Sequence, residues 1–403
     1  MRVSRGHRTA MGDVMGTNGP VRLGMIGGGR GSFIGGVHRI AARMDGHFHL
    51  VAGVLSSDPE RAKASAAEAG IAPERAYANV EEMLALEAAR PDGMEVVAVV
   101  TPNHLHFGAA KACLEANLHV ICDKPVTSTL ADAVELAGIA ERSGKLFVLT
   151  HNYTGYPMVR QMRAMVAAGE IGDLRVLHSE YAQDWLATPL EAQGHPGALW
   201  RTDPARSGAG GCIGDIGTHA YNLAAFVTGL EPDSLLADLA IFGPGRRLDD
   251  NAGILLRYPN GARGMLWATQ VAVGNENHLV LRVYGTKGGL EWYQEDPNRL
   301  WFTRQGEAKR MLSRNGAEAW PDAAAGSRIP AGHPEGFLEA FANIYAEAAA
   351  AIGAARSGGT IPDARYPTIK DGVRGLRFIE ACVHSSAADG RWITIDKGLT
   401  PAP

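Results

Sequence analysis

Residues 21–36 read VRLGMIGGGRGSFIGG, an apolar run that leads directly into a cluster of glycines. Glycines at such a turn let the backbone reverse tightly and approach a pyrophosphate, whose charge is met by the N-terminus of the next helix. A flexible surface loop has the same composition, so the turn alone is a weak signal. Its place after the first strand of an alternating strand and helix pattern predicts a dinucleotide site with Gly27, Gly29 and Gly35 as its glycines.

The third glycine of the usual G-x-G-x-x-G pattern is displaced in this chain. Gly35 takes its place, which leaves about three extra residues around positions 30–32. The spacing therefore predicts a phosphate loop that is wider than usual.

The choice between NAD and NADP depends on the end of the second strand. NAD enzymes place an acidic residue on the ribose 2′-hydroxyl there, about twenty residues beyond the last glycine. Ser56 stands in that position, with Asp58 as the acidic alternative. Serine does not repel a 2′-phosphate, and Arg61 or Arg30 could pair with one. The sequence therefore does not decide between NAD and NADP.

Short apolar runs alternate with helical stretches over residues 21–150. Predicted buried strands cover residues 21–26, 50–55, 96–100, 119–122 and 146–150. Predicted helices cover residues 59–69, 80–89, 105–116 and 130–143. This pattern is typical of an α/β fold with a doubly wound parallel sheet. We expect residues 21–150 to form the dinucleotide-binding domain and residues 1–20 to be a disordered lead-in.

The pattern changes after residue 150. Predicted helices cover residues 157–168, 215–228, 334–352 and 370–388, and predicted strands cover residues 174–183, 235–242, 253–258, 262–269, 279–284 and 289–292. These elements predict a second, α+β domain over residues 151–395 with a large, mainly antiparallel, open sheet. Because an open sheet needs covering, we expect a homodimer or homotetramer.

Composition limits the classes of partner and compartment. A net charge of −4 gives no electrostatic reason to expect nucleic acid or an anionic membrane. The four cysteines have neither disulfide nor zinc-site spacing, and no apolar stretch is long enough to span a membrane. We expect a cytoplasmic protein with no metal site.

Three motifs follow one another along the chain. Residues 100–106 read VTPNHLH, residues 122–125 read CDKP, and residues 210–219 read GGCIGDIGTH. Together they resemble the Gfo/Idh/MocA family of oxidoreductases, and the similarity runs from residue 21 to about residue 395. The family usually has Glu-Lys-Pro in the second motif, and Asp123 keeps the carboxylate.

The resemblance implies an N-terminal Rossmann domain, a C-terminal domain whose open sheet often mediates oligomerisation, and a hydride-transfer site between them. It implies cofactor contacts from the first two motifs, at Thr101, Asn103, His106, Asp123 and Lys124. A cis peptide bond before Pro125 is also expected.

Lys124, Asp215 and His219 are the predicted catalytic residues. Lys124 follows a sheet strand at the edge where open α/β sheets bind ligands, and its ammonium can stabilise a reacting oxygen. Asp215 and His219 lie four residues apart on a predicted helix, so the carboxylate can orient a histidine that titrates near neutrality. The sequence does not decide whether Lys124 or His219 takes the proton.

Aromatic and polar side chains predict a polyhydroxylated ring as substrate, because such a ring stacks its C–H face and hydrogen-bonds its hydroxyls. The candidate residues are Asn152, Tyr153, Asp184, Trp185, Trp200 and Arg201. Residues 152–153 and 183–185 are similar to the branch of the family that acts on glycosides and anhydrosugars. Arg201 could bind a substrate carboxylate or the cofactor, or could pair with Asp203. His333 either faces the cleft from the start of a late helix or has a cap or loop role.

Three functions compete on this basis. The first is an NAD(P)-dependent sugar, glycoside or inositol dehydrogenase. The second is a glycosidase of the same family that oxidises its sugar transiently, eliminates the aglycone and reduces the sugar again. The third is a binding protein that senses nucleotides or sugars without catalysis, which would be expected to lose Lys124 or His219; both are present.

Overall fold

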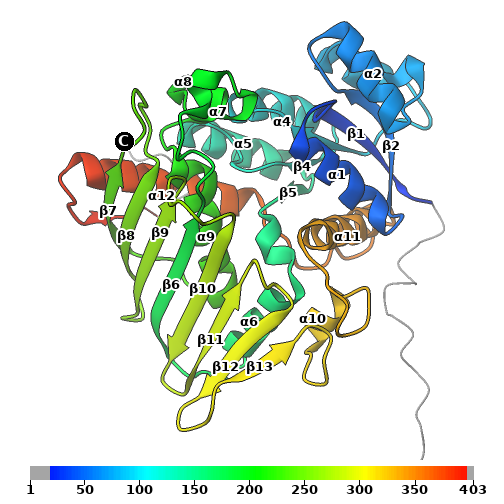
Figure 1. Ribbon diagram of the computed structural model, residues 1–403. Coiled ribbons are helices and arrows are strands. Elements are labelled where there is room, and N and C mark those ends of the chain that lie inside the picture. Colours follow the sequence, from blue (N-terminus) through cyan, green and yellow to red (C-terminus); the bar gives the residue numbers. More distant parts are fainter. Residues whose placement is uncertain (1–18, 397–403) are drawn as a thin grey trace, which may run out of the picture.

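The computed structural model describes residues 19–396, and these residues build two sheets with helices packed against them (Figure 1). Residues 1–18 of the predicted disordered lead-in lie outside this range. The smaller sheet contains five strands and the larger one nine.

The five-stranded sheet is parallel throughout and has the strand order β2-β1-β3-β4-β5. Its strands are β1 (Val21–Gly27), β2 (Phe48–Val54), β3 (Val96–Val100), β4 (His119–Cys122) and β5 (Phe147–Leu149). The all-valine and alanine strand β3 is buried along its whole length, as expected for the centre of a sheet that is covered on both faces. The predicted doubly wound parallel sheet is confirmed.

Helices and short helical turns connect these strands. They are α1 (Phe33–Met44), α2 (Pro59–Ala69), η1 (Pro73–Arg75), α3 (Val80–Ala88), η2 (Asn103–Leu105), α4 (His106–Glu115) and α5 (Leu130–Ser143). Side chains cap several of them: Ser32 caps α1, Asp58 caps α2 and Thr129 caps α5. Helices α4 and α5 pack on one face of the sheet, and α1 packs on the other.

A helix from the far end of the chain completes the α1 face of this sheet. Helix α11 (Phe337–Arg356) lies beside α1 in Figure 1 and shares an apolar core with β1. Tyr345 of α11 contacts His38 of α1 through an Oη to Nδ1 hydrogen bond of 2.8 Å. The α1 face of the parallel sheet is therefore covered in part by a helix that follows residue 150 in the sequence.

The nine-stranded sheet has the order β13-β12-β11-β10-β6-β9-β8-β7-β14 and is antiparallel except for the β6–β9 pair. Its strands are β6 (Leu174–Ala182), β7 (Ser234–Ala240), β8 (Asn251–Arg257), β9 (Arg263–Thr269), β10 (His278–Gly285), β11 (Gly288–Tyr293), β12 (Arg299–Arg304), β13 (Arg310–Ser313) and β14 (Ile393–Thr394). The predicted large, mainly antiparallel sheet is confirmed. Strands β12, β13 and β14 are additional to the prediction; β13 and β14 form the two edges of the sheet and are only four and two residues long.

The helices of this half are η3 (Asn152–Gly155), α6 (Pro157–Ala167), η4 (Leu190–Gln193), α7 (Pro196–Arg201), α8 (Pro204–Ser207), η5 (Ile213–Gly217), α9 (Thr218–Thr228), α10 (Pro321–Ala325) and α12 (Ile369–Ala387). Helices α6, α9 and α12 cover one face of the large sheet (Figure 1). The opposite face carries the exposed side chains of Leu255, Met265 and Trp267. None of the helices within residues 19–396 combines the length and the apolar character that crossing a bilayer requires.

Candidate active site

The glycine turn between β1 and α1 is shaped by close backbone contacts. A Cβ atom on Gly35 would lie 2.1 Å from the carbonyl oxygen of Gly28, and one on Gly29 would lie 2.3 Å from the carbonyl oxygen of Leu55. Gly27 has a φ of 79°, in the left-handed region. Helix α1 thus meets the strand at Gly35, the position that the spacing predicts for the third glycine.

The turn leaves donors available for an anion. The hydroxyl of Ser32 caps α1 by accepting from the Gly35 amide at 3.1 Å, while the Phe33 and Ile34 amides have no acceptor within their own helix. Gly31 has a φ of 84° and no atom near the position of a Cβ. The guanidinium of Arg30 is turned aside, because its Nε donates to Glu68 on α2 at 2.8 Å.

Ser56 lies beside the glycine turn, directly after Leu55. Its hydroxyl accepts from Arg61 Nε at 2.9 Å and from the Asp58 amide at 3.1 Å. The Asp58 carboxylate caps α2 by accepting from the Arg61 amide at 2.7 Å. The acidic alternative to Ser56 is therefore used by its own helix, and Ser56 and Arg61 form one polar pair at the end of β2.

The first motif supplies one free polar atom next to the turn. Thr101 packs against Gly27, and within residues 19–396 its buried Oγ1 has no hydrogen-bond partner. Asn103 donates to the Ser207 carbonyl at 3.1 Å, and the ring of His106 contacts the carbonyl oxygens of Pro125 and Thr101, each at 2.7 Å. Asn103 and His106 hold the backbone of the site together. The glycine cradle and the unpartnered Thr101 hydroxyl fit a dinucleotide.

Lys124, which follows β4, forms an ion pair with Asp215 in the turn that precedes α9. The Lys124–Pro125 peptide bond is cis, as expected. Lys124 Nζ donates to Asp215 Oδ1 at 3.0 Å and also to the Asp215 backbone carbonyl. Both side chains are largely buried, with 14% and 13% of their surfaces exposed. Two of the three hydrogens of the ammonium are thus committed to Asp215.

Two further donors surround the Asp215 carboxylate. Its Oδ2 accepts from Arg201 Nε at 3.0 Å and from Gln270 Nε2 at 2.8 Å. Burial alone would raise the pKa of Asp215, but the charges of Arg201 and Lys124 outweigh it and hold the pKa far below its ordinary value. Asp215 is therefore a fixed anion that positions two cations.

A π-helical turn carries Asp215 into this position. The predicted helix over residues 215–228 is instead two elements, because residues 213–217 form the π-turn η5 and the α-helix begins at Thr218. The buried Asp249 carboxylate anchors the turn by accepting from the Gly211 amide at 2.6 Å and the Ile213 amide at 2.8 Å. Such turns occur frequently at functional sites.

His219 is oriented by another histidine, which corrects the predicted pairing with Asp215. The Asp215 oxygens accept hydrogen bonds from Lys124, Arg201 and Gln270, whereas His219 Nδ1 lies 3.4 Å from His151 Nδ1. Burial first, and then the charge of Lys124, lower the pKa of His219 well below its ordinary value. His219 is therefore neutral near pH 7.

Asp123 supports Lys124 from behind. Its Oδ1 accepts from the Lys124 amide at 3.0 Å and from the Thr150 hydroxyl at 2.9 Å. Burial opposes ionisation, but contact with His38 and the charge of Lys124 lower the pKa of the Asp123 carboxyl far below its usual range. This carboxylate ties the end of β4 to the end of β5.

Three of the predicted substrate residues gather around the Asp215 cluster. The Arg201 guanidinium carbon lies 4.2 Å from the ring centre of Trp200 and 5.7 Å from that of Trp185. Arg201 pairs with Asp215, and Asp203 takes Arg247 at 3.0 Å instead. Tryptophan faces thus stand next to the predicted catalytic carboxylate.

The remaining predicted substrate residues have different surroundings. The Tyr153 ring packs edge-on against His219, with ring centres 4.9 Å apart, and its hydroxyl contacts that of Tyr181. Asn152 is buried, and its Nδ2 has no partner among the described residues. Asp184 accepts from the Gly274 amide at 3.0 Å, outside this cluster.

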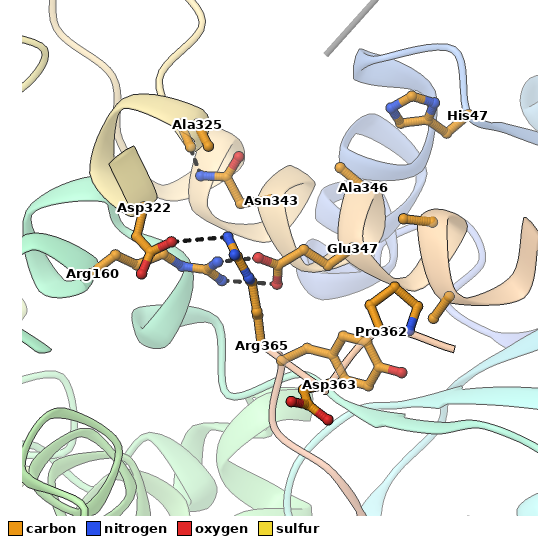
Figure 2. A pocket seen from close by; sticks show the side chains of 14 residues that line it. His47, Arg160, Asp322, Ala325, Asn343, Ala346, Glu347, Pro362, Asp363 and Arg365 are labelled. Atoms are coloured by element: carbon orange, nitrogen blue, oxygen red, sulfur yellow. Dashed lines mark hydrogen bonds and ion pairs between the residues drawn. The ribbon is translucent and has the colours of Figure 1, made fainter. Parts of the chain in front are cut away.

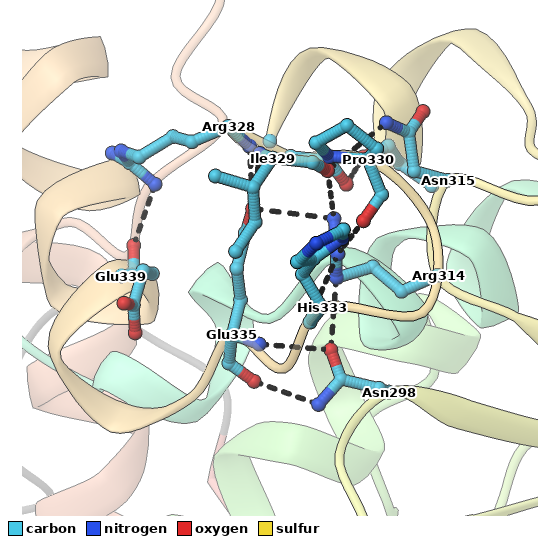
Figure 3. Close-up of polar contacts among 12 residues, drawn as sticks. Asn298, Arg314, Asn315, Arg328, Ile329, Pro330, His333, Glu335 and Glu339 are labelled. Carbon is cyan, nitrogen blue, oxygen red and sulfur yellow. Dashed lines mark hydrogen bonds and ion pairs between the residues drawn. The ribbon is translucent and has the colours of Figure 1, made fainter.

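His333 lies in a loop that is fastened to the large sheet (Figure 3). The buried Arg314 guanidinium donates to the carbonyl oxygens of Ile329, Pro330 and His333. Phe337, the first residue of α11, follows this loop, and its ring centre lies 6.2 Å from that of Tyr153. Of the roles expected for His333, the structure therefore gives it the one in a loop.

A separate cavity of about 290 Å³ lies between α6, α10 and α11 (Figure 2). Two ion pairs lie in its walls, Arg160 with Glu347 and Arg365 with Asp322. None of the predicted site residues lines it.

Sequence reasoning missed His151 and Gln270. Gln270 follows β9 and His151 follows β5, so each reaches the cluster from the end of a strand. The only available signal was position at a strand end, and neither residue belongs to one of the three motifs.

Comparisons with known proteins agree with this geometry. Residues 21–161 match the oxidoreductase family with an NAD-binding Rossmann fold, and residues 159–291 match the GFO/IDH/MocA C-terminal domain. The chain is similar to an oxidoreductase from Sinorhizobium meliloti of known structure, with 56% identity, coverage of 93% and 99% of the two chains, and a TM-score of 0.84.

Two relatives are known with a cyclic polyol or a sugar derivative. An inositol dehydrogenase homolog from Azotobacter vinelandii, solved with NADH and myo-inositol, is 37% identical with a TM-score of 0.85 and coverage of 94% and 98%. The levoglucosan dehydrogenase of Pseudarthrobacter phenanthrenivorans is 28% identical over 70% of this chain and 75% of its own. With both domains matched in order, the chain belongs to the Gfo/Idh/MocA family of NAD-binding oxidoreductases.

Proposed function

We propose that this chain is an NAD-dependent dehydrogenase that oxidises a ring hydroxyl of a cyclitol, sugar or glycoside. The observation that carries the proposal is the Lys124–Asp215 ion pair next to a neutral, buried His219. This arrangement supplies a hydrogen-bond donor and a proton acceptor for one hydroxyl group. It lies beyond the carboxyl ends of the parallel strands, where ligands of such sheets bind.

Lys124 acts as the donor in this proposal. Its ammonium gives two hydrogens to Asp215, which leaves one for the oxygen of the reacting hydroxyl. An ammonium held by a carboxylate has no lone pair, so it is not the base. Its positive charge stabilises the alkoxide character that develops on the oxygen.

His219 acts as the base. It is neutral near pH 7, and among the described residues its Nε2 has no hydrogen-bond partner. The hydroxyl proton goes to His219 Nε2, and the O–H bonding electrons form the second bond of the carbonyl. Bound NAD⁺ supplies the acceptor for the hydride that leaves the same carbon. One alcohol and one NAD⁺ thus give one ketone, one NADH and one proton.

The substrate class follows from the side chains around Asp215. Trp185 and Trp200 offer aromatic faces to a ring, and Arg201 places a guanidinium between them and Asp215. Myo-inositol and levoglucosan, the compounds named for two relatives, both present ring hydroxyls. These features support a polyhydroxylated ring rather than an open-chain acid.

The arginines near the glycine turn favour NAD over NADP in this proposal. Arg30 is paired with the Glu68 carboxylate, which would repel a 2′-phosphate, and Arg61 Nε is held by Ser56. Both arginines that could neutralise the phosphate therefore have other partners.

We further propose that a second copy of the chain covers the open sheet face. Exposed Leu255, Met265 and Trp267 form an apolar strip there, and burying it would stabilise a symmetric dimer. Light scattering tests the assembly, and a monomer would contradict it.

The four cysteines are free and buried, which supports a reducing, cytoplasmic setting.

A spectrophotometric screen tests the function. Inositols, sugars and glycosides are offered with NAD⁺ or NADP⁺, and formation of reduced nicotinamide is followed. We expect turnover of at least one cyclic polyol with NAD⁺ and its loss in His219→Gln and Lys124→Ala. The absence of turnover with every polyol, or wild-type activity in Lys124→Ala, would refute the proposal.

A further inference from the structure

His151 is a buried histidine whose ring meets that of His219. It follows β5, only 2% of its surface is exposed, and its Nδ1 lies 3.4 Å from His219 Nδ1. The ring planes are nearly perpendicular, at 87°, with centres 5.2 Å apart. We propose that His151 accepts a hydrogen bond from His219 Nδ1–H and so fixes the tautomer of His219 that leaves Nε2 bare to receive the substrate proton.

A contact between two Nδ1 atoms restricts where the hydrogens sit. A neutral imidazole carries one N–H and one lone pair. Two hydrogens facing each other would repel, and two lone pairs facing each other would leave both nitrogens without a partner. One ring must therefore donate through Nδ1 and the other must accept.

The lysine decides which ring donates, and this step rests on the proposed function. Lys124 has one hydrogen left for the reacting oxygen after two go to Asp215. A hydroxyl that accepts from Lys124 must send its own hydrogen to an acceptor. His219 Nε2 is that acceptor only if the ring hydrogen is on Nδ1, which makes His151 the accepting partner.

Asp215 does not fill this role. A carboxylate at hydrogen-bond distance is the usual means of fixing a catalytic histidine. Here the Asp215 oxygens accept from Lys124, Arg201 and Gln270. The carboxylate acts on His219 through its charge, and the hydrogen-bonding function passes to His151.

The charges around the two rings keep both neutral. For His151, burial first and then the charge of Lys124 lower the pKa to about 4, while Asp371 and Asp123 oppose this. For His219, burial, Lys124 and His151 act in the same direction, and Asp215 and Asp123 oppose them. The hydroxyls of Tyr153 and Tyr181 pair with each other beside the His219 ring. Two neutral imidazoles sharing one hydrogen is the state these surroundings favour.

The test is a direct reading of the tautomer in the full chain. Histidine labelled with ¹⁵N in the ring is incorporated, two-bond ¹H–¹⁵N spectra are recorded near pH 7 without substrate, and the His219 signals are identified by their loss in His219→Gln. We expect a protonated Nδ1 and a bare Nε2. A hydrogen on His219 Nε2 in the wild-type protein would overturn the proposal.

Two variants of His151 complete the test. His151→Phe keeps an aromatic ring but removes the acceptor, so the His219 signals should move toward the other tautomer, and kcat should fall about tenfold to a hundredfold with KM nearly unchanged. His151→Asn is the matched control, because its carboxamide oxygen can accept near the position of Nδ1 and should restore most of kcat. An unchanged His219 tautomer in a folded His151→Phe protein would also overturn the proposal.

The two proposals fail in different ways. The spectra do not depend on turnover, so a bare Nε2 without polyol oxidation would refute the dehydrogenase alone. If His151→Phe does not fold, the wild-type spectrum and His151→Asn still decide the tautomer.

Discussion

Replacing Asp215 by asparagine perturbs the site at its centre while keeping its shape. Asp215 accepts from Lys124 on one oxygen and from Arg201 and Gln270 on the other. Asparagine has one acceptor oxygen, so its NH₂ group must face either Lys124 or the Arg201 side, donor against donor.

The magnitude follows from the bonds that are lost. A hydrogen bond to a charged group contributes about 1.5–3 kcal/mol, and the cation left unpaired in a largely buried site adds to the loss. Lys124 and Arg201 would also repel each other without the carboxylate between them. We expect Asp215→Asn to lower kcat/KM by about 100-fold to 1000-fold, which corresponds to roughly 3–4 kcal/mol.

The assay is steady-state formation of NADH with the polyol that the screen identifies. Asp389→Asn is the matched control, since Asp389 is exposed beyond the end of α12 and should give wild-type rates. Melting curves establish that both variants are folded. A folded Asp215→Asn protein within about threefold of wild type would refute the reasoning that this carboxylate positions Lys124.

Three further changes have defined outcomes. Gly35→Ala puts a Cβ 2.1 Å from the Gly28 carbonyl oxygen and should weaken NADH binding at least tenfold in a fluorescence titration. Gly36→Ala is the control on the same helix, because its Cβ meets no atom within 4 Å and the variant should bind NADH normally. Equal NADH affinities of the two variants would contradict the close approach of α1 to the turn. Ser56→Asp should weaken NADP⁺ binding more than NAD⁺ binding, and an equal effect would show that Ser56 does not face the ribose. His151 has a pKa lowered to about 4, so the unfolded chain takes up a proton at that residue below about pH 6.5 while the folded chain does not, and stability falls as pH falls. At pH 5 this residue should lower the free energy of unfolding by about 2 kcal/mol. In denaturant titrations, His151→Asn should therefore lose less unfolding free energy between pH 7 and pH 5 than the wild-type protein. An equal loss in both proteins would contradict this prediction.

Much of the fold follows from local sequence patterns. The five parallel strands are largely buried and read as short apolar runs, and the glycine turn is specified by contacts that exclude any side chain at Gly35. The placement of α11 over β1 does not follow from such patterns, because nothing local to residues 337–356 distinguishes one apolar partner from another.

The site was predictable where a motif carried it. The motifs around Lys124 and Asp215 identified both partners of the ion pair. The spacing of Asp215 and His219 suggested a hydrogen bond between them, but each has other partners in the structure. His151 and Gln270 come from strand ends far apart in the sequence, so only the folded chain brings them to the cluster.

Transfer of deuterium tests the central claim most directly. A cyclic polyol that the protein oxidises, carrying deuterium on the reacting ring carbon, is incubated with NAD⁺, and the nucleotide is analysed by mass spectrometry. The proposed mechanism predicts one deuterium in each molecule of NADH formed, together with one ketone. Release of an aglycone from a glycoside without net NADH, or NADH that contains no deuterium, would contradict it.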